Sequence, residues 1–486
     1  MSIAGALPND VLLEIFAFYL DLSQQDHSSS SSIAHGASLD PWHTLVHVCR
    51  RWRFTVFASP RYLNIRLHCT NKTPARKLLD IWPSFPIVVL CHQSLHSQLR
   101  GVLNVYAALN CPDRICEIDL GGIPIKLFKR VAAINIPLPA LTSLRLSSDF
   151  DWHWQPIIKD SFLGGIAPRL RSLELKGIPF PAPQKLLLSA TDLVTLRMER
   201  IPSTGYISPE EIVTCLSTLT KLEELSFGYQ SYQSTSFHPH QTSQRPPVPS
   251  AVLPALTSFR FQGDCWYLED LITRITFPVL DNFDAMFFSW GNFNSPQLFE
   301  FINRIEALDM HHRADISFHP HFVKTALSRQ EGMADCGKIK FGILCNAFGW
   351  QRSYLMQLRS FLPSLPTLEH LHIHDHGSFP TSYGQFSTDD SRWQWLELLH
   401  PFTSVKRLSL SGKLALRVAR ALQDVSGEEV TEVLPALRDI SIFGHEPSPG
   451  EQSGAILEAL RKFLATLHLS GRCVSVHYYC SKEEDG

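Results

Sequence analysis

The sequence lacks the short motifs by which most enzymes are recognised. It contains no Gly-x-Gly-x-x-Gly loop, no phosphate-binding loop of the Gly-x-x-x-x-Gly-Lys-Ser/Thr type, no Gly-x-Ser-x-Gly elbow and no His-Glu-x-x-His helix. These absences leave no positive reason to assign a catalytic activity. We therefore expect a non-enzymatic protein that needs no cofactor.

Long apolar runs and cysteine pairs are absent as well. No apolar run reaches the roughly 18 residues that a membrane-spanning helix needs, and the first residues do not resemble a signal peptide. The 11 cysteines are scattered and form no Cys-x-x-Cys pair, which is typical of reduced intracellular thiols. We expect a cytoplasmic or nuclear protein that does not contact membranes.

What is present is the composition of a large folded chain. The 486 residues are 44% hydrophobic and 19% charged, which at this length predicts two or three domains. The net charge of −2 argues against a general nucleic-acid binder. Residues 50–79 nevertheless hold eight basic groups and no acidic one. This basic run is either a solvated face or a surface for an acidic partner.

The first amphipathic helix is expected just after Pro8. Asn9 is a good N-cap, and Asp10 and Glu14 lie where the helix dipole favours carboxylates. Apolar residues then recur at helical spacing, at Val11, Leu12, Ile15, Phe16, Tyr19 and Leu20.

A second helix is expected beyond a polar insertion at residues 21–40, whose serine run cannot bury enough apolar surface to order itself. Asp40 as N-cap and Pro41 at the first helical position mark its start. Its apolar stripe comprises Trp42, Leu45, Val46, Cys49, Trp52 and Val56. Two short helices cannot bury both stripes alone, so the stripes either pack on each other or face a partner.

These two helices resemble an F-box, the module that attaches a protein to the Skp-type adaptor of a cullin–RING ubiquitin ligase. The Leu-Pro pair, the acidic-apolar helix with Ile-Phe, and Val-Cys-x-x-Trp all match the family pattern. We assign residues 1–66 to this module. The resemblance implies an acidic adaptor that contacts Leu7, Pro8, Leu12, Ile15, Phe16, Val48, Cys49 and Trp52.

The rest of the chain repeats the pattern Leu-x-x-Leu-x-Leu. Copies begin at residues 141, 170, 193, 222, 256, 280, 305, 368, 405 and 437, with a weaker copy at 115 and a candidate strand at 338–344. Each core alternates as a half-buried strand must, and each buries its leucines only by stacking on a neighbour. The alternative is an ordinary α/β domain with several leucine-rich strands.

The repeats resemble an irregular leucine-rich repeat, and their combination with the N-terminal module looks like the F-box families of mushroom-forming fungi. The resemblance implies an α/β solenoid over residues 111–480, with a curved parallel sheet and helices on its outer side. Residues 67–110 would connect it to the F-box, and 481–486 would form an acidic tail. Helices are expected at 297–305, 354–362, 393–399, 414–422 and 455–467, and flexible insertions at 230–252 and 376–391.

Strand alternation places polar side chains on the sheet face, where solenoids bind partners. We expect target contacts from Arg145, Glu174, Arg197, Arg260, Asp309, His372 and His374. The alternative is a solvated sheet face that binds nothing.

Four histidines between His370 and His376 form a stripe on one side of a single strand. Imidazoles two residues apart can share a zinc ion, and His311, His312, His319 and His321 could approach them. Structural zinc sites usually contain cysteine pairs, so we expect no metal here. A pH-sensitive partner surface is favoured instead.

Taken together, the resemblances imply the substrate-recognition subunit of a Skp–cullin–F-box ubiquitin ligase. The F-box would hold the adaptor, and through it a cullin, while the repeats capture an unknown target protein. Ubiquitin transfer would follow from proximity. The alternative is a repeat scaffold without a ubiquitin role.

Overall fold

The fold is described by a computed structural model. It covers all residues except 1–6, 29–41, 60–62, 64–65, 70–74, 82–84, 93–98, 123–124, 149–156, 181–183, 231–249, 289–295, 306–310, 330–337, 345–366, 377–389, 412–413, 424, 426–431, 445–451 and 481–486. Asp40, Pro41, Asp309, the expected helix 354–362, the acidic tail and most of the three expected insertions therefore lie outside the described residues.

The chain forms two compact units, Met1–Ile207 and Ser208–Gly486. Each contains a mostly parallel sheet with helices, which confirms the predicted α/β class. The domain boundaries expected after residues 66 and 110 stay predictions. None of the described helices is both long and apolar enough to cross a membrane.

The N-terminal unit begins with three helices, α1 (Asn9–Ser28), α2 (Trp42–Val48) and α3 (Arg50–Ala58). The second expected helix is thus two helices, because Cys49 adopts an extended backbone with φ −158° and ψ 170°. Its Sγ accepts a hydrogen bond from the Trp52 amide at 3.5 Å, so it caps α3. Helix α1 continues to Ser28, which corrects the expectation that the polar insertion begins at residue 21.

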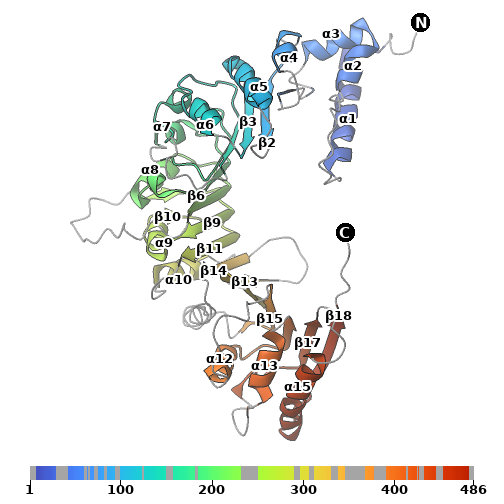
Figure 1. The fold of residues 1–486 in the computed structure, drawn as a ribbon, viewed down its shortest axis with the longest axis vertical. Coiled ribbons are helices and arrows are strands. Elements are labelled where there is room, and N and C mark those ends of the chain that lie inside the picture. The colour runs from blue at the N-terminus through green and yellow to red at the C-terminus, as the bar shows by residue number, and fades with distance from the viewer. Residues whose placement is uncertain are drawn as a thin grey trace, which may run out of the picture. The chain divides into compact units, whose positions relative to one another are not determined.

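Six strands follow in the same unit. They are β1 (Leu67–Cys69), β2 (Ile87–His92), β3 (Ile115–Gly121), β4 (Ser143–Ser147), β5 (Ser172–Lys176) and β6 (Thr195–Ile201), and they pair in chain order and in parallel. The connecting helices are α4 (Ala75–Ile81), α5 (Leu99–Leu109), α6 (Ile125–Ala132) and α7 (Gln184–Ser189). Repeat leucines Leu144, Leu173 and Leu196 are in register and fully buried, as the pattern predicts. Figure 1 shows α5, α6 and α7 grouped along one side of these strands.

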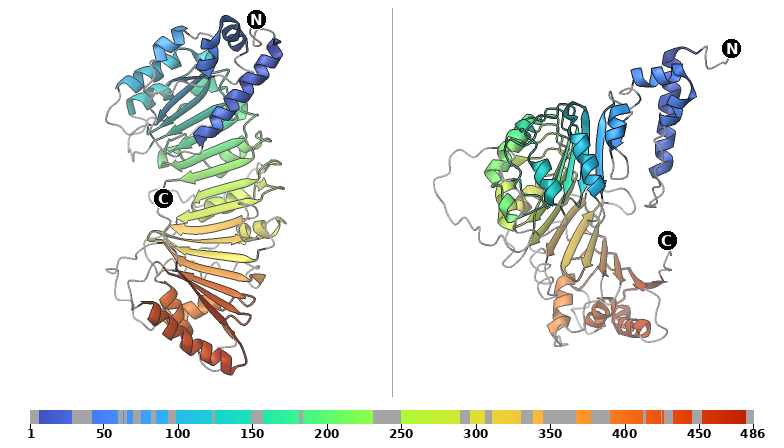
Figure 2. Two further views of the ribbon diagram at one scale, coloured as in Figure 1. Left: turned by 90° about the vertical axis from the view of Figure 1, so that its right-hand side faces the viewer. Right: turned by 45° about the horizontal axis from the view of Figure 1, so that its top comes forward.

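Among the described residues of the C-terminal unit, ten strands belong to one sheet. In spatial order its strands are β7 (Glu224–Tyr229), β9 (Ser258–Gly263), β11 (Asn282–Phe288), β14 (Lys338–Leu344), β13 (Phe322–Ser328), β12 (Arg313–Phe318), β15 (His370–Asp375), β16 (Arg407–Ser411), β17 (Asp439–Gly444) and β18 (Ser475–Cys480). A separate parallel pair joins β8 (Ala251–Val252) to β10 (Ile275–Thr276). The described helices of this unit are α8 (Pro209–Leu216), α9 (Cys265–Ile272), α10 (Pro296–Asn303), α12 (Asp390–Leu399), α13 (Leu414–Gln423) and α15 (Gln452–Leu469). Figure 2 shows the strands of each unit side by side.

One hairpin departs from the expected parallel array. Strand β13 is antiparallel to both β12 and β14, whereas the other pairings within this sheet are parallel. Most of the repeat expected from residue 305 lies outside the described residues, and the next described strand, β12, begins at Arg313. His311, which alternation would have placed on the sheet face, is 1% exposed. The hairpin itself is closed by a tight turn, in which the His319 amide donates to the Phe322 carbonyl at 2.8 Å.

Candidate functional site

The start of α1 is fixed against α3 by one arginine. The Arg51 guanidinium donates to the Leu7 carbonyl and to Asn9 Oδ1, the latter at 2.9 Å from Nη2 and 3.2 Å from Nε. The Leu12 amide donates to the Pro8 carbonyl at 3.1 Å and closes the first turn. The Leu-Pro segment is therefore held in one conformation, with Pro8 exposed and Leu7 half-buried.

Two of the expected adaptor contacts lie inside this helical module. Leu12 is 1% exposed, and Phe16 is fully buried with its ring centroid 4.7 Å from that of the half-buried Trp52. These side chains hold α1 on α3. A partner could reach Leu12 and Phe16 only if the module unpacked. Cys49 is exposed and serves as the cap described above.

The outer face of α1 is apolar and exposed. Val11, Ile15 and Phe18 are 42%, 46% and 66% exposed and recur at spacings of four and three, so they share one face of the helix. Val48 and Phe54 are also exposed, at 55% and 71%. We name these five residues the apolar helix surface. Sequence reasoning found Ile15 and Val48 and missed Phe18 and Phe54, although a helix that is apolar on two sides is itself a signal of a second contact.

The helical module packs on the beginning of the sheet in its own unit. The ring of Phe85, which precedes β2 and is 1% exposed, lies 5.1 Å from that of Trp42 and 5.5 Å from that of Phe57. Edge-to-face contacts of this kind stabilise beyond their area alone. Helices α2 and α3 are thereby anchored, while the apolar helix surface stays exposed.

On the sheet of the N-terminal unit, the expected target contacts form a charge ladder. Arg145 on β4 pairs with Asp119 on β3 at 3.2 Å and, through two bonds of 2.9 Å, with Glu174 on β5. Arg197 on β6 lies 3.6 Å from Glu174. The structure thus brings three expected contacts together, and it pairs their charges with one another.

Further expected contacts lie in the C-terminal unit. The exposed Arg260 on β9 lies 3.7 Å from Asp284 on β11, which also accepts from Lys324 on β13 at 3.0 Å. The polar sheet face of each unit therefore carries alternating charges, which favours a polar protein partner over a polyanion.

The histidine stripe lies on β15 as alternation predicts. His370, His372 and His374 face outward, while Leu371 and Ile373 between them are at most 1% exposed. The His374 Nε2 lies 2.5 Å from the hydroxyl oxygen of Ser317.

An ion-paired carboxylate supports the stripe from β12. Asp315 accepts two bonds from Arg313 Nε and Nη2, at 2.9 and 2.8 Å, and lies 3.2 Å from His372 Nδ1. Burial alone would raise the pKa of Asp315, but the hydrogen bonds from His372 and Arg313 and the charge of Arg313 lower it to about 2. Asp315 is therefore ionised under all ordinary conditions and orients His372.

The imidazoles continue into a series of adjacent rings. Centroid distances are 4.6 Å from His372 to His374, 4.4 Å from His374 to His376 and 4.6 Å from His376 to His319 beyond β12. Burial and the charges of His372 and His376 lower the pKa of His374 to about 4. Burial and His376 also lower the pKa of His319. At neutral pH these two imidazoles are therefore uncharged.

Among the residues that the structure describes, no group of three or more His, Cys, Asp or Glu side chains is placed to hold a metal ion. The stripe is a row of adjacent imidazole rings, and His372 lies against the Asp315 carboxylate.

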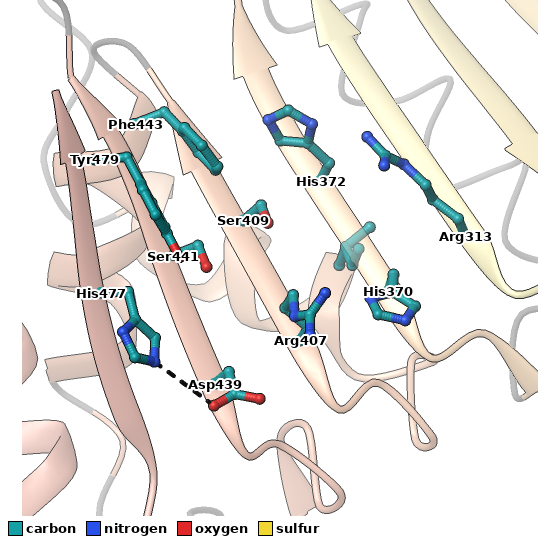
Figure 3. Close-up of a pocket in the computed structure, with 11 residues that line it drawn as sticks. Arg313, His370, His372, Arg407, Ser409, Asp439, Ser441, Phe443, His477 and Tyr479 are labelled. Carbon is teal, nitrogen blue, oxygen red and sulfur yellow. Dashed lines mark ion pairs between the residues drawn. The ribbon is translucent and has the colours of Figure 1, made fainter. Parts of the chain in front are cut away.

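Beside the stripe, the sheet face of the C-terminal unit is hollowed over β15–β18. The hollow has a volume of about 420 Å³. Figure 3 shows its floor at Ser409 and Ser441, with His372 on one side and His477 on the other. Sequence reasoning missed this hollow, since it depends on which strands are neighbours.

No protein-family model and no curated protein matches this sequence. The function must therefore be argued from the apolar helix surface, the paired charges and the hollow.

The lowered pKa of His374 predicts that the protein loses stability in mild acid. Since the pKa of His374 is about 4 when folded and 6.5 ordinarily, the unfolded chain takes up this proton first as the pH falls. The stability from neutral His374 is complete above pH 6.5 and is lost progressively towards pH 4. Between pH 7 and pH 5, the Tm of the C-terminal unit should fall less in His374→Asn than in the wild type. The expected difference is about 2–4 °C, which corresponds to a loss of roughly 1 kcal/mol in the free energy of unfolding after solvent screening.

The matched control for this experiment is His468→Asn, which changes an exposed histidine on α15. Its Tm should fall with pH as the wild type does. An equal fall in His374→Asn would show that the stripe does not titrate in this range.

Proposed function

We propose that the chain is a non-catalytic substrate-recognition subunit of a Skp–cullin–F-box ubiquitin ligase. The observation that carries the proposal is the apolar helix surface. Exposed apolar patches on a folded module mark sites of protein docking. This patch lies on the helices whose Leu-Pro and Val-Cys-x-x-Trp segments resemble an F-box. The hydrogen bonds of Arg51 to Leu7 and Asn9 fix the Leu-Pro segment.

The sheets support the second half of the role. Repeated Leu-x-Leu strands stack in register and bury their leucines, which is the behaviour of an irregular leucine-rich repeat. Their polar faces carry paired charges and the hollow. In this proposal the target protein binds these faces while the helical module holds the adaptor.

Charged substitutions on the apolar helix surface test the proposal. Ile15→Asp combined with Phe18→Asp should reduce co-purification with a Skp-type adaptor about 100-fold or more, because a desolvated carboxylate costs several kcal/mol at an apolar contact. Leu7→Ala with Pro8→Ala should also abolish it. Circular dichroism would establish that the helices remain folded.

The matched control is Leu188→Asp on α7, since Leu188 is 40% exposed and Ile15 is 46% exposed. Adaptor binding should be unchanged in this control. Wild-type chain that never co-purifies with the adaptor, or Ile15→Asp with Phe18→Asp chain that binds it normally, would overturn the proposal.

A scaffold without a ubiquitin role is the second candidate. The contacts of Trp42 and Phe57 with Phe85 favour it, because they would also suit a helical cap that covers the end of the sheet. In that case the chain binds its target but never the adaptor, and the same co-purification separates the two functions.

A further inference from the structure

The hollow over β15–β18 follows from strand register. Pairing aligns His372, Ser409, Ser441 and His477 in one row across four strands. Because strand side chains stand nearly perpendicular to the sheet, two serines between two imidazoles leave a depression. With strands about 4.8 Å apart, the row spans roughly 14 Å from His372 to His477.

One end of the hollow carries two arginines. The row that precedes the serines aligns Arg313, His370 and Arg407 on three neighbouring strands, and Arg313 is already paired with Asp315. Asp439 follows on the next strand, where it accepts from the Ser475 hydroxyl and lies 3.9 Å from His477 Nε2. Because Arg313 is paired with Asp315, a single acidic group of a ligand would bind Arg407 and His370.

The other end is aromatic and exposed. Phe443 and Tyr479 are 37% and 49% exposed and stack with centroids 5.0 Å apart and an interplanar angle of 14°. They follow Asp439 and Ser475 by four residues on the same strands. Four residues of β-strand span roughly 13 Å, so the aromatic end and the arginine end are that far apart.

The ring series shows what shape of ligand fits. His372 lies 5.8 Å from Phe443, across the small Ser409, and joins the aromatic end to His374, His376 and His319. The aromatic surface therefore extends beyond the hollow, which suits an extended chain better than a compact molecule. The lowered pKa values of His374 and His319 keep this surface uncharged at neutral pH, which disfavours a nucleic acid.

We propose that the hollow binds an extended segment of a target protein in which an acidic side chain and an aromatic side chain lie two to four residues apart. The acidic group meets Arg407 and His370, and the aromatic ring packs on Phe443 and Tyr479. The assignment of the segment to a ligase target rests on the function proposed above, whereas the chemistry of the segment does not.

A peptide array tests this chemistry with the purified full chain. The probes are immobilised Gly/Ser peptides that carry one Asp and one Trp at separations of one to six residues, with Asp→Asn and Trp→Ser versions of each. Wild-type chain should prefer separations of two to four over the others by about tenfold or more. Preference for no peptide, for a different spacing, or for an oligonucleotide spotted on the same array would overturn the proposal.

Variants of the two ends make the test specific. In Arg407→Gln the discrimination between Asp and Asn peptides should disappear while that between Trp and Ser remains. In Phe443→Ser with Tyr479→Ser the discrimination between Trp and Ser peptides should disappear, while that between Asp and Asn peptides remains. Arg420→Gln, an exposed arginine on α13, should retain both preferences. Unchanged selection in the variants of the hollow would refute the assignment.

Adaptor co-purification measured on the same proteins separates this inference from the proposed function. If the wild type selects peptides but never binds the adaptor, the ligase role fails and the hollow stands. If it binds the adaptor but selects no peptide, the hollow fails and the ligase role stands.

Discussion

Phe16→Ala should unfold the N-terminal helical module while leaving the sheets intact. The Phe16 ring is fully buried and packs against the Trp52 ring with a tilt of 59°, so it is a main contact between α1 and α3. Removal of a buried phenylalanine ring costs about 3–5 kcal/mol. A module of three short helices has little stability beyond that amount. Adaptor binding should therefore be lost because the binding surface no longer exists.

Amide hydrogen exchange along α1 and α3 measures this loss directly. Phe18→Ala is the matched control, because Phe18 lies on the same helix and is 66% exposed. It should change the free energy of unfolding by no more than about 0.5 kcal/mol, yet it should weaken adaptor binding. Equal loss of protection in the two variants would show that Phe18 also belongs to the core. Equal adaptor binding in Phe18→Ala and wild type would argue against docking through the outer face of α1.

Neutralising two carboxylates around Arg274 should destabilise the C-terminal unit strongly. The Arg274 side chain is only 3% exposed and lies 2.6 Å from Glu210 on α8 and 3.0 Å from Asp270 on α9. Glu210→Gln with Asp270→Asn leaves this buried guanidinium without a counter-charge, which costs about 3–5 kcal/mol. Adding Arg274→Met removes the buried charge and should recover most of the loss.

Hydrogen exchange of the α8 and α9 amides reports the free energy of opening in each variant. Glu300→Gln is the control. Glu300 is 55% exposed and its ion-pair partner Arg304 is 72% exposed, so this pair should contribute no more than about 0.5 kcal/mol to the free energy of unfolding. If the triple variant were as unstable as the double one, the carboxylates would act through packing or capping and not by balancing the buried charge.

The sequence was sufficient to predict the strands that carry the leucine pattern. Leu144, Leu173 and Leu196 recur in the same pattern, and burial of each needs the next. Strands β12, β13 and β18 were not foreseen because they lack that spacing. The break between α2 and α3 was missed because the stripe of apolar residues runs through Cys49 without interruption, while the backbone there is extended.

The candidate site was predictable only where one helix or one strand determines it. Alternation alone puts His372 and His374 on one face, and helical spacing finds Ile15. Helical spacing does not say which of two apolar faces is buried, and the resemblance to an F-box implied an adaptor contact for Phe16, which the structure buries. The hollow could not be foreseen at all, because only pairing between β16 and β17 places Ser409 beside Ser441.

The β12–β13 hairpin has a consequence for how this chain could have evolved. Strands β12 and β14 both run parallel to their other neighbours, β15 and β11, so β12 and β13 together form an insert that preserves strand direction on either side. Deletion of such an insert would let β14 meet β15 as one repeat meets the next. The insert also supplies Arg313 to the hollow and Asp315 to the histidine stripe. New ligand chemistry could thus be gained or lost at this point by insertion or deletion, without altering a single repeat leucine.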